Sequence, residues 1–189
     1  MRSPRRVSLA NLRVRLAVPL TDAALLLPSL AWSALPVGAS APDFHLEAAM
    51  AGQVSKFALA DALKSGPVVL YFFPAAFTSG CNREAHAFAE HIDEFKAAGA
   101  TVIGVSNDQI DTISKFSTQE CAGKFSVGAD PEGTVIRAYD AKLPLIGKAD
   151  RVSYVIGRDG KVSYVYASMS PDGHIENTLK AVRALSKAP

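Results

Sequence analysis

The feature that most constrains the fold is a continuous apolar run, Pro67–Phe73, which Pro74 brings to an end. The run is short and rich in β-branched and aromatic residues, so it predicts a strand that is buried on both faces. Residues 81–98 follow, and their apolar side chains recur at helical spacing until Gly99, which predicts a helix. A buried strand that leads into an amphipathic helix is typical of an α/β domain.

The rest of the chain continues this alternation of strands and helices. Strands are expected at 43–46, 56–59, 101–106, 125–127, 152–156 and 162–166, and helices at 61–64, 111–123, 132–139 and 175–185. The last two strands flank an Asp159-Gly160 turn and should form a hairpin. This order predicts an α/β fold with a central mixed β-sheet and helices on both faces.

Cys81 lies where the buried strand has ended and the helix begins. A helix N-terminus presents unpaired backbone N–H groups and a partial positive charge. Both favour a thiolate over a thiol, and the thiolate is the reactive form of cysteine. The position therefore predicts a nucleophilic cysteine, whereas the alternative is an inert, small core residue.

The chain has one other cysteine, Cys121. In an exported protein, a pair of cysteines often forms a structural disulfide. In a reducing compartment, the same pair is more often catalytic or metal-binding. The cysteine count alone leaves these alternatives open.

The segment before Cys81 carries a motif, Pro74-x-x-x-Thr78-x-x-Cys81, directly after the buried strand. The motif resembles the active-site signature of peroxiredoxins, and residues 38–46, Gly-x-x-Ala-Pro-Asp-Phe-x-Leu, are similar to the opening segment of many members. The resemblance covers nearly all of residues 35–187. It implies a thioredoxin-like fold and a thiol peroxidase that needs no cofactor.

The resemblance also implies a role for each matching residue. Cys81 would attack a peroxide oxygen, Pro74 would shield the thiolate, and Thr78 would hydrogen-bond to the thiolate and the peroxide. Arg151 precedes the expected strand 152–156 and would stabilise the charge on the leaving oxygen. The supporting residues would be Glu84, which orients an arginine, and Gly80, whose N–H group helps to bind the peroxide.

Attack on peroxide leaves a cysteine sulfenic acid, with which a second thiol can condense to form a disulfide. Cys121 is the only candidate in the chain for this second thiol. Its place near the end of the expected helix 111–123 resembles that of the longer-spaced resolving cysteine in peroxiredoxins of the bacterioferritin-comigratory type. The shorter-spaced form would need a cysteine where this chain has His86. Two alternatives remain: a free Cys121 in a one-cysteine enzyme, and a permanent structural disulfide.

Residues 1–33 differ in character from the remainder. They carry five arginines and one acidic residue, whereas residues 34–189 have 15 basic and 17 acidic side chains. An arginine-rich start followed by an interrupted apolar stretch predicts a signal or leader segment, with the peroxiredoxin domain at 34–189. We therefore expect a periplasmic or exported protein, with a cytoplasmic one as the alternative.

Composition and spacing also bear on partners and on rival functions. No basic cluster in residues 34–189 indicates nucleic acid, and the apolar stretch is too short and broken for stable membrane insertion. No metal site is expected, and all four histidines are expected at the surface. Copper-carrying and thiol–disulfide exchange proteins of this fold need a second cysteine close to the first, which Cys81 lacks. The resemblance to peroxiredoxins implies a peroxide and thioredoxin or a similar dithiol as partners, and a monomer or weak homodimer.

Overall fold

A computed structural model describes residues 34–187, so the expected leader at 1–33 lies outside the described residues. The strands are β1 (His45–Met50), β2 (Gln53–Ala58), β3 (Val68–Phe72), β4 (Thr101–Ser106), β5 (Ser126–Ala129), β6 (Val152–Ile156) and β7 (Val162–Ala167). The helices are α1 (Leu59–Ser65), α2 (Ser79–Ala97), α3 (Ile110–Gln119), α4 (Thr134–Ala138) and α5 (His174–Leu185).

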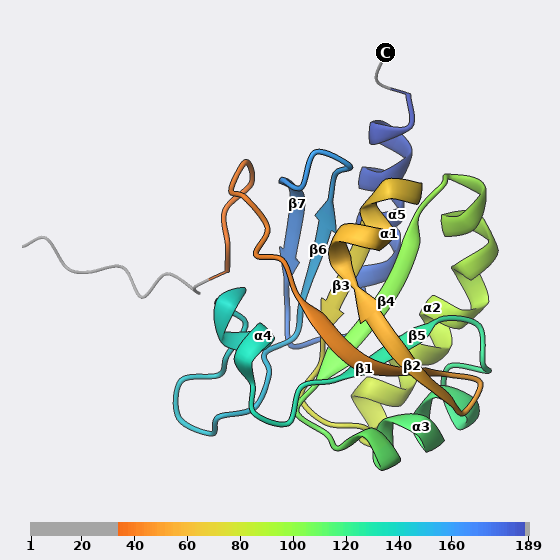
Figure 1. The fold of residues 1–189 in the computed structure, drawn as a ribbon, viewed down its shortest axis with the longest axis vertical. Coiled ribbons are helices and arrows are strands. Elements are labelled where there is room, and N and C mark those ends of the chain that lie inside the picture. The colour runs from red at the N-terminus through yellow and green to blue at the C-terminus, as the bar shows by residue number, and fades with distance from the viewer. Residues whose placement is uncertain (1–33, 188–189) are drawn as a thin grey trace, which may run out of the picture. The chain divides into compact units, whose positions relative to one another are not determined.

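The strands form one mixed sheet in the order β2-β1-β5-β4-β3-β6-β7 (Figure 1). β3 and β4 run parallel, as do β4 and β5, whereas β6 runs antiparallel to β3. β3 lies inside the sheet and every one of its residues is buried, as its apolar sequence predicts. The predicted α/β fold with a mixed sheet is confirmed.

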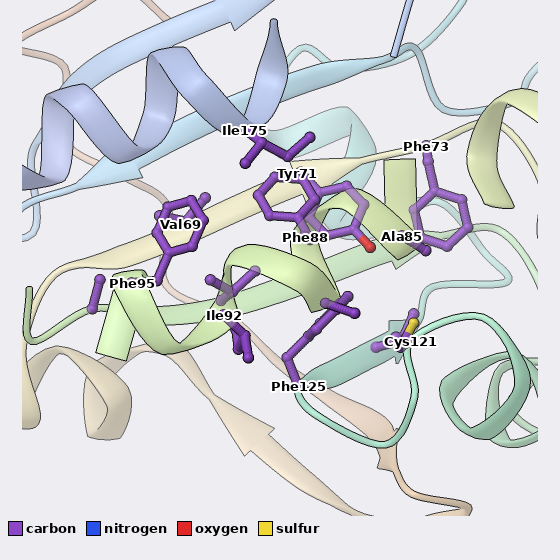
Figure 2. Close-up of a cluster of buried hydrophobic side chains, with 14 of the residues drawn as sticks. Val69, Tyr71, Phe73, Ala85, Phe88, Ile92, Phe95, Cys121, Phe125 and Ile175 are labelled. Atoms are coloured by element: carbon purple, nitrogen blue, oxygen red, sulfur yellow. The ribbon is translucent and has the colours of Figure 1, made fainter. Parts of the chain in front are cut away.

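Helices cover both faces of this sheet. Alternate residues of β3 point to opposite sides, so Tyr71 packs in one core cluster and Phe72 in the other. The first cluster lies under α2, α3 and α5 (Figure 2). Both cysteines belong to it. The second lies under α1 and α4. The nucleophile predicted at Cys81 is thus held within a fully packed layer.

The predicted bounds differ most from the structure in two places. The first hairpin, predicted as strands at 43–46 and 56–59, pairs residues 45–50 with 53–58 around a tight turn in which Ala51 and Gly52 both have positive φ. Alanine-rich β1 has little strand propensity of its own; it pairs with β2 along its whole length and with β5 over residues 47–49, and these pairings make it a strand.

The second error concerns the helix predicted at 111–123, which ends at Gln119. Gly123 has a φ of 66° and donates from its N–H to the carbonyl of Ser117 at 2.9 Å, a closure that ends a helix. Cys121 therefore lies in the turn after α3 and not on the helix.

Gly104 of β4 faces Tyr71 and leaves room for its ring. A Cβ atom built on Gly104 would lie 2.5 Å from Tyr71 Cζ. Tyr71 cannot withdraw easily, because its ring stacks on Phe88 at a centroid distance of 4.4 Å. Gly104→Ala should therefore lower the free energy of unfolding by about 1–3 kcal/mol, measured by urea denaturation. The penalty should shrink in a Tyr71→Leu background, and equal penalties in both backgrounds would contradict this packing.

Candidate active site

Cys81 lies in the first turn of α2, beside the end of β3, and only 2% of its surface is exposed. The loop between β3 and α2 is held by Asp108, whose carboxylate accepts hydrogen bonds from Ala76 N–H at 2.7 Å and Ser106 Oγ at 2.8 Å. Phe77, in the same loop, has a φ of 63° and packs edge-to-face on Phe116. A strained loop of this kind persists only when its surroundings hold it, and such loops cluster at active sites.

The sheet brings Arg151 to this helix N-terminus. β6 pairs with β3 so that Val152 lies opposite Phe72, and Arg151 directly precedes Val152. Its Nη2 atom donates to Cys81 Sγ at 3.3 Å, and its Nε donates to the carbonyl of Met169 at 3.1 Å. A guanidinium in that position stabilises negative charge on sulfur.

Gly80 makes room for this contact. A Cβ atom at Gly80 would lie 3.2 Å from Arg151 Nη2, closer than most real Cβ contacts. The absent side chain thus lets the guanidinium reach Cys81 across the first turn of α2.

Pro74 and Thr78 flank the loop. Pro74 is half-buried directly after β3, and Thr78 is the N-cap residue of α2. The Thr78 hydroxyl donates to the carbonyl of Ala75 at 3.0 Å. Among the hydrogen bonds of residues 34–187 there is none between Thr78 and Cys81. The hydroxyl must therefore turn away from Ala75 before it can contact the thiolate or a peroxide.

Glu84 lies on the same helix as Cys81 and is 1% exposed. Its Oε2 atom forms an ion pair with Arg151 Nη1, while its Oε1 atom has no hydrogen-bond partner. Burial raises the pKa of Glu84 to about 8, although Arg151 acts in the opposite direction. Burial would lower the pKa of Arg151, but Glu84 and Cys81 outweigh it, and the pKa of Arg151 is raised. The cation beside Cys81 therefore stays charged.

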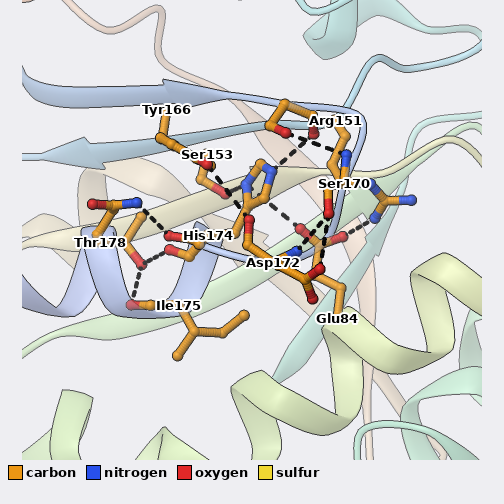
Figure 3. Close-up of polar contacts among 12 residues, drawn as sticks. Glu84, Arg151, Ser153, Tyr166, Ser170, Asp172, His174, Ile175 and Thr178 are labelled. Carbon is orange, nitrogen blue, oxygen red and sulfur yellow. Dashed lines mark hydrogen bonds and ion pairs between the residues drawn. The ribbon is translucent and has the colours of Figure 1, made fainter.

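His174 contradicts the prediction that all four histidines lie at the surface. It begins α5 and is completely buried, with Nε2 at 3.0 Å from the carbonyl of Ser168 and Nδ1 at 2.8 Å from Ser153 Oγ. Its Nδ1 also lies 3.6 Å from Glu84 Oε1, beside the ion pair of Glu84 and Arg151 (Figure 3). Arg151 in turn contacts Cys81. The helical periodicity of residues 175–185 predicts the helix, but it does not show that an imidazole at the start of the helix faces inward.

Because His174 is buried, the stability of the fold should depend on pH. Burial lowers the pKa of His174 from 6.5 to about 4, so as the pH falls the imidazole is protonated in the unfolded chain before it is protonated in the folded one. The contribution of a neutral His174 to the free energy of unfolding is therefore complete above pH 6.5 and is lost between about pH 6.5 and 4. Urea denaturation across this range should show a loss on the order of 3 kcal/mol in the wild type relative to His174→Asn.

An exposed histidine provides the control for that measurement. His45→Asn should leave the pH dependence of the wild type in place, because His45 is exposed on β1. Parallel stability curves for the wild type and His174→Asn would contradict a buried, neutral imidazole.

Cys121 is completely buried in the same core cluster as Cys81. Its turn is held against α2 by two contacts: His86 Nε2 lies 2.9 Å from Glu120 Oε2, and Lys124 Nζ donates to the carbonyl of Ala89 at 3.0 Å. Both cysteines are free thiols. Burial, together with Glu120, raises the pKa of Cys121 well above its ordinary value. In this conformation Cys121 is therefore an unreactive thiol.

Within residues 34–187, no set of three or more His, Cys, Asp or Glu side chains is placed to hold a metal ion. No helix in the same residues combines the length and apolar character needed to cross a membrane.

Comparison with known proteins identifies relatives that cover most of the chain. The AhpC/TSA family matches residues 37–165. The chain is 35% identical over 152 residues to the chloroplastic peroxiredoxin Q of Oryza sativa subsp. japonica, a match that covers 78% of this chain and 67% of that protein.

Solved structures agree. Peroxidoxin BcpB from Mycobacterium tuberculosis superposes with a TM-score of 0.72 at 33% identity, covering 79% of this chain and 97% of that one. AhpC of the same organism has a TM-score of 0.72 at 23% identity, covers 82% of this chain and 95% of its own, and supports the fold alone. The chain therefore belongs to the AhpC/TSA family as a peroxiredoxin of the bacterioferritin-comigratory type, an antioxidant thiol peroxidase that reduces peroxides with electrons from a thiol.

Proposed function

We propose that Cys81 is the cysteine that attacks peroxide in this enzyme. The observation that carries the proposal is the 3.3 Å contact between Arg151 Nη2 and Cys81 Sγ at a helix N-terminus. The thiolate attacks one peroxide oxygen, the O–O bond breaks, and the other oxygen leaves as water or alcohol after it takes up a proton. Arg151 and the N–H groups of Gly80 and Cys81 stabilise the charge that develops on the leaving oxygen.

Pro74 and Thr78 complete this proposal. Pro74 limits the access of solvent to the thiolate. Thr78 hydrogen-bonds to the thiolate and the bound peroxide once its hydroxyl leaves the carbonyl of Ala75, a bond of 3.0 Å between groups near the surface. Such a weak local bond is easily exchanged for one to a charged ligand.

Cys121 resolves the sulfenic acid in this account. Its thiol sulfur attacks the Cys81 sulfur, a Cys81–Cys121 disulfide forms, and water leaves. Because Cys121 is buried and has a raised pKa, the turn at 120–124 must first open and expose it. Thioredoxin or a similar dithiol then reduces the disulfide by thiol–disulfide exchange.

A coupled peroxidase assay of the full chain with thioredoxin, thioredoxin reductase and NADPH tests the role of Cys121. Cys121→Ser should leave the first oxidation of Cys81 intact and should abolish steady turnover with thioredoxin, because no disulfide forms. Ala122→Ser is the matched control, since it changes an exposed side chain of the same turn. Unimpaired turnover of Cys121→Ser would indicate a one-cysteine enzyme, and a disulfide that persists under thioredoxin would indicate a structural bond.

Two further properties rest on the sequence. The arginine-rich, apolar residues 1–33 support export to the periplasm or beyond, which N-terminal sequencing of the mature protein from cell fractions would test. The likeness to peroxiredoxins of the bacterioferritin-comigratory type supports a monomer or weak homodimer, which sedimentation velocity at several concentrations would test.

A further inference from the structure

Tyr71 of β3 is buried, and its hydroxyl has no hydrogen-bond partner within the part of the chain that the structure describes. The proposed chemistry makes no use of this side chain. Its ring packs against the rings of Phe73, Phe88 and Phe125, at centroid distances of 5.7, 4.4 and 6.2 Å. The hydroxyl extends over Gly104, where a Cβ atom would come within 2.6 Å of it. A polar group is thus held in an apolar part of the core.

The unpaired hydroxyl of Tyr71 differs from those of two other buried tyrosines. Tyr139 donates to the carbonyl of Pro42 at 2.7 Å, and Tyr154 donates to the carbonyl of Tyr139 at 2.6 Å. A buried hydroxyl loses its hydrogen bonds to water, and this loss destabilises the fold when no protein group replaces them. Phenylalanine would fill nearly the same space as Tyr71 without this penalty.

The unpaired hydroxyl lies close to the segment that carries Cys121. Cys121 belongs to the same core cluster, and Phe125, just after the turn at 120–124, packs edge-to-face against the ring of Tyr71. Burial raises the pKa of Tyr71, and Cys121 is the ionisable neighbour that raises it most. Figure 2 shows the hydroxyl on the side of the core where Cys121 lies. Opening of the turn would therefore let water reach the hydroxyl.

We infer that the unpaired Tyr71 hydroxyl destabilises the closed turn at 120–124, promotes its opening, and thereby sets how readily Cys121 reaches Cys81. The inference deepens the proposed function and rests on it. The hydroxyl lacks a partner while the turn is closed, and it binds water once the turn is open. Its penalty is therefore relieved only in the open conformation, which shifts the equilibrium towards opening. Tyr71 is thus a positioning residue that acts through Cys121.

Two contacts that close the turn oppose this effect. His86 Nε2 lies 2.9 Å from Glu120 Oε2, and Lys124 Nζ donates to the carbonyl of Ala89 at 3.0 Å. Both contacts tie the turn to α2, whereas the hydroxyl of Tyr71 lies in the core that the turn helps to cover. The closed and open conformations are therefore balanced by groups on opposite sides of the turn.

Alkylation of Cys121 by N-ethylmaleimide measures the opening directly, in the full chain with Cys81→Ser so that only one thiol reacts. At low reagent concentration, the rate is proportional to the fraction of molecules in which the turn is open. Tyr71→Phe should lower this rate about tenfold, which corresponds to about 1.4 kcal/mol. The same variant should resist urea better than its parent, because the closed core no longer holds an unpaired hydroxyl.

Tyr154→Phe is the matched control, since it removes the same atom from a buried tyrosine on the other face of the sheet. The hydroxyl of Tyr154 is paired: it donates to the carbonyl of Tyr139 and accepts from the N–H of Leu35 at 3.1 Å. Tyr154→Phe should therefore lower the resistance to urea. It should leave the alkylation of Cys121 within about twofold of its parent.

The two-cysteine protein connects the opening to the reaction. After one equivalent of hydrogen peroxide, quenching with acid and mass spectrometry follow the sulfenic acid on Cys81 and its conversion into the Cys81–Cys121 disulfide. Tyr71→Phe should form the disulfide about tenfold more slowly, because the open turn is rarer. It should leave the preceding oxidation of Cys81 within about twofold of the wild type.

The outcomes separate the inference from the proposed function. Reduced stability of Tyr71→Phe would show that the hydroxyl has a stabilising partner, and unchanged alkylation would show that the turn does not cover it; either result overturns the inference. Slower disulfide formation with unchanged alkylation would place Tyr71 in the chemistry instead, and also overturns it. If hydrogen peroxide left Cys81 unoxidised, the proposed function would fail, whereas the alkylation of Cys121 in the Cys81→Ser chain does not depend on that step.

Discussion

Replacing Cys81 with serine should lower the rate of peroxide reduction by at least about 10³-fold, as loss of a catalytic nucleophile does in other enzymes. A serine hydroxyl is not ionised near neutral pH and cannot form a sulfenic acid. The substitution should lower the rate of peroxide reduction without unfolding the protein, because serine fits the small, buried space of Cys81 in the first turn of α2. The measurement is peroxide consumption in the coupled assay, with circular dichroism as the check on folding.

Cys121→Ser is the informative comparison for this variant. It should retain a single oxidation of Cys81 in the presence of peroxide, whereas Cys81→Ser should show none at either position. A Cys81→Ser protein that consumed hydrogen peroxide at the wild-type rate would end the assignment.

The second large effect is expected for Arg151→Met, which should slow the oxidation of Cys81 by about 10²-fold or more. The substitution removes the donor at 3.3 Å from Sγ and the positive charge that accompanies it. Arg151→Lys should recover only part of the rate, because one ammonium cannot reproduce the paired contacts of a guanidinium to Cys81 and Glu84. Stopped-flow measurement of the single oxidation of Cys81 gives these rates directly.

Arg151→Met also leaves the Glu84 carboxyl buried without its cation, which should destabilise the fold. The double variant Arg151→Met with Glu84→Met removes both charges and should regain stability without regaining rate. An oxidation rate for Arg151→Met within threefold of the wild type would contradict a role for this side chain in the chemistry.

Much of the fold could be predicted because β3 and its helix carry strong local patterns. The apolar run up to Phe72 can hardly be anything but an interior strand, and α2 has its apolar residues on one face. The bounds of the first hairpin are harder to predict, since alanine-rich β1 acquires its strand character from pairing with β2 along its whole length and with β5 over residues 47–49. The end of α3 depended on the positive φ of Gly123, which the helical pattern up to Gln119 does not reveal.

The candidate site divides in the same way. Pro74, Thr78 and Cys81 are close in sequence, so a motif identifies them. Arg151 is identified through the resemblance to peroxiredoxins, because it directly precedes an expected strand. His174 and Asp108 act through tertiary contacts with residues far along the chain, and a lone histidine or aspartate carries no spacing signal. The Thr78 hydroxyl points towards Ala75 because of its side-chain rotamer, which cannot be predicted from a sequence pattern.

The role of Cys81 is tested most directly by treating the reduced full chain with one equivalent of hydrogen peroxide and mapping its cysteine-containing peptides by mass spectrometry. We expect a peptide pair joined by a Cys81–Cys121 disulfide in the wild type, and a trapped sulfenic acid on Cys81 in the Cys121→Ser variant. A stable sulfenic acid on Cys81 beside a free Cys121 in the wild type would contradict the resolving role of Cys121, and oxidation that spared Cys81 would contradict its role as the peroxide-attacking cysteine.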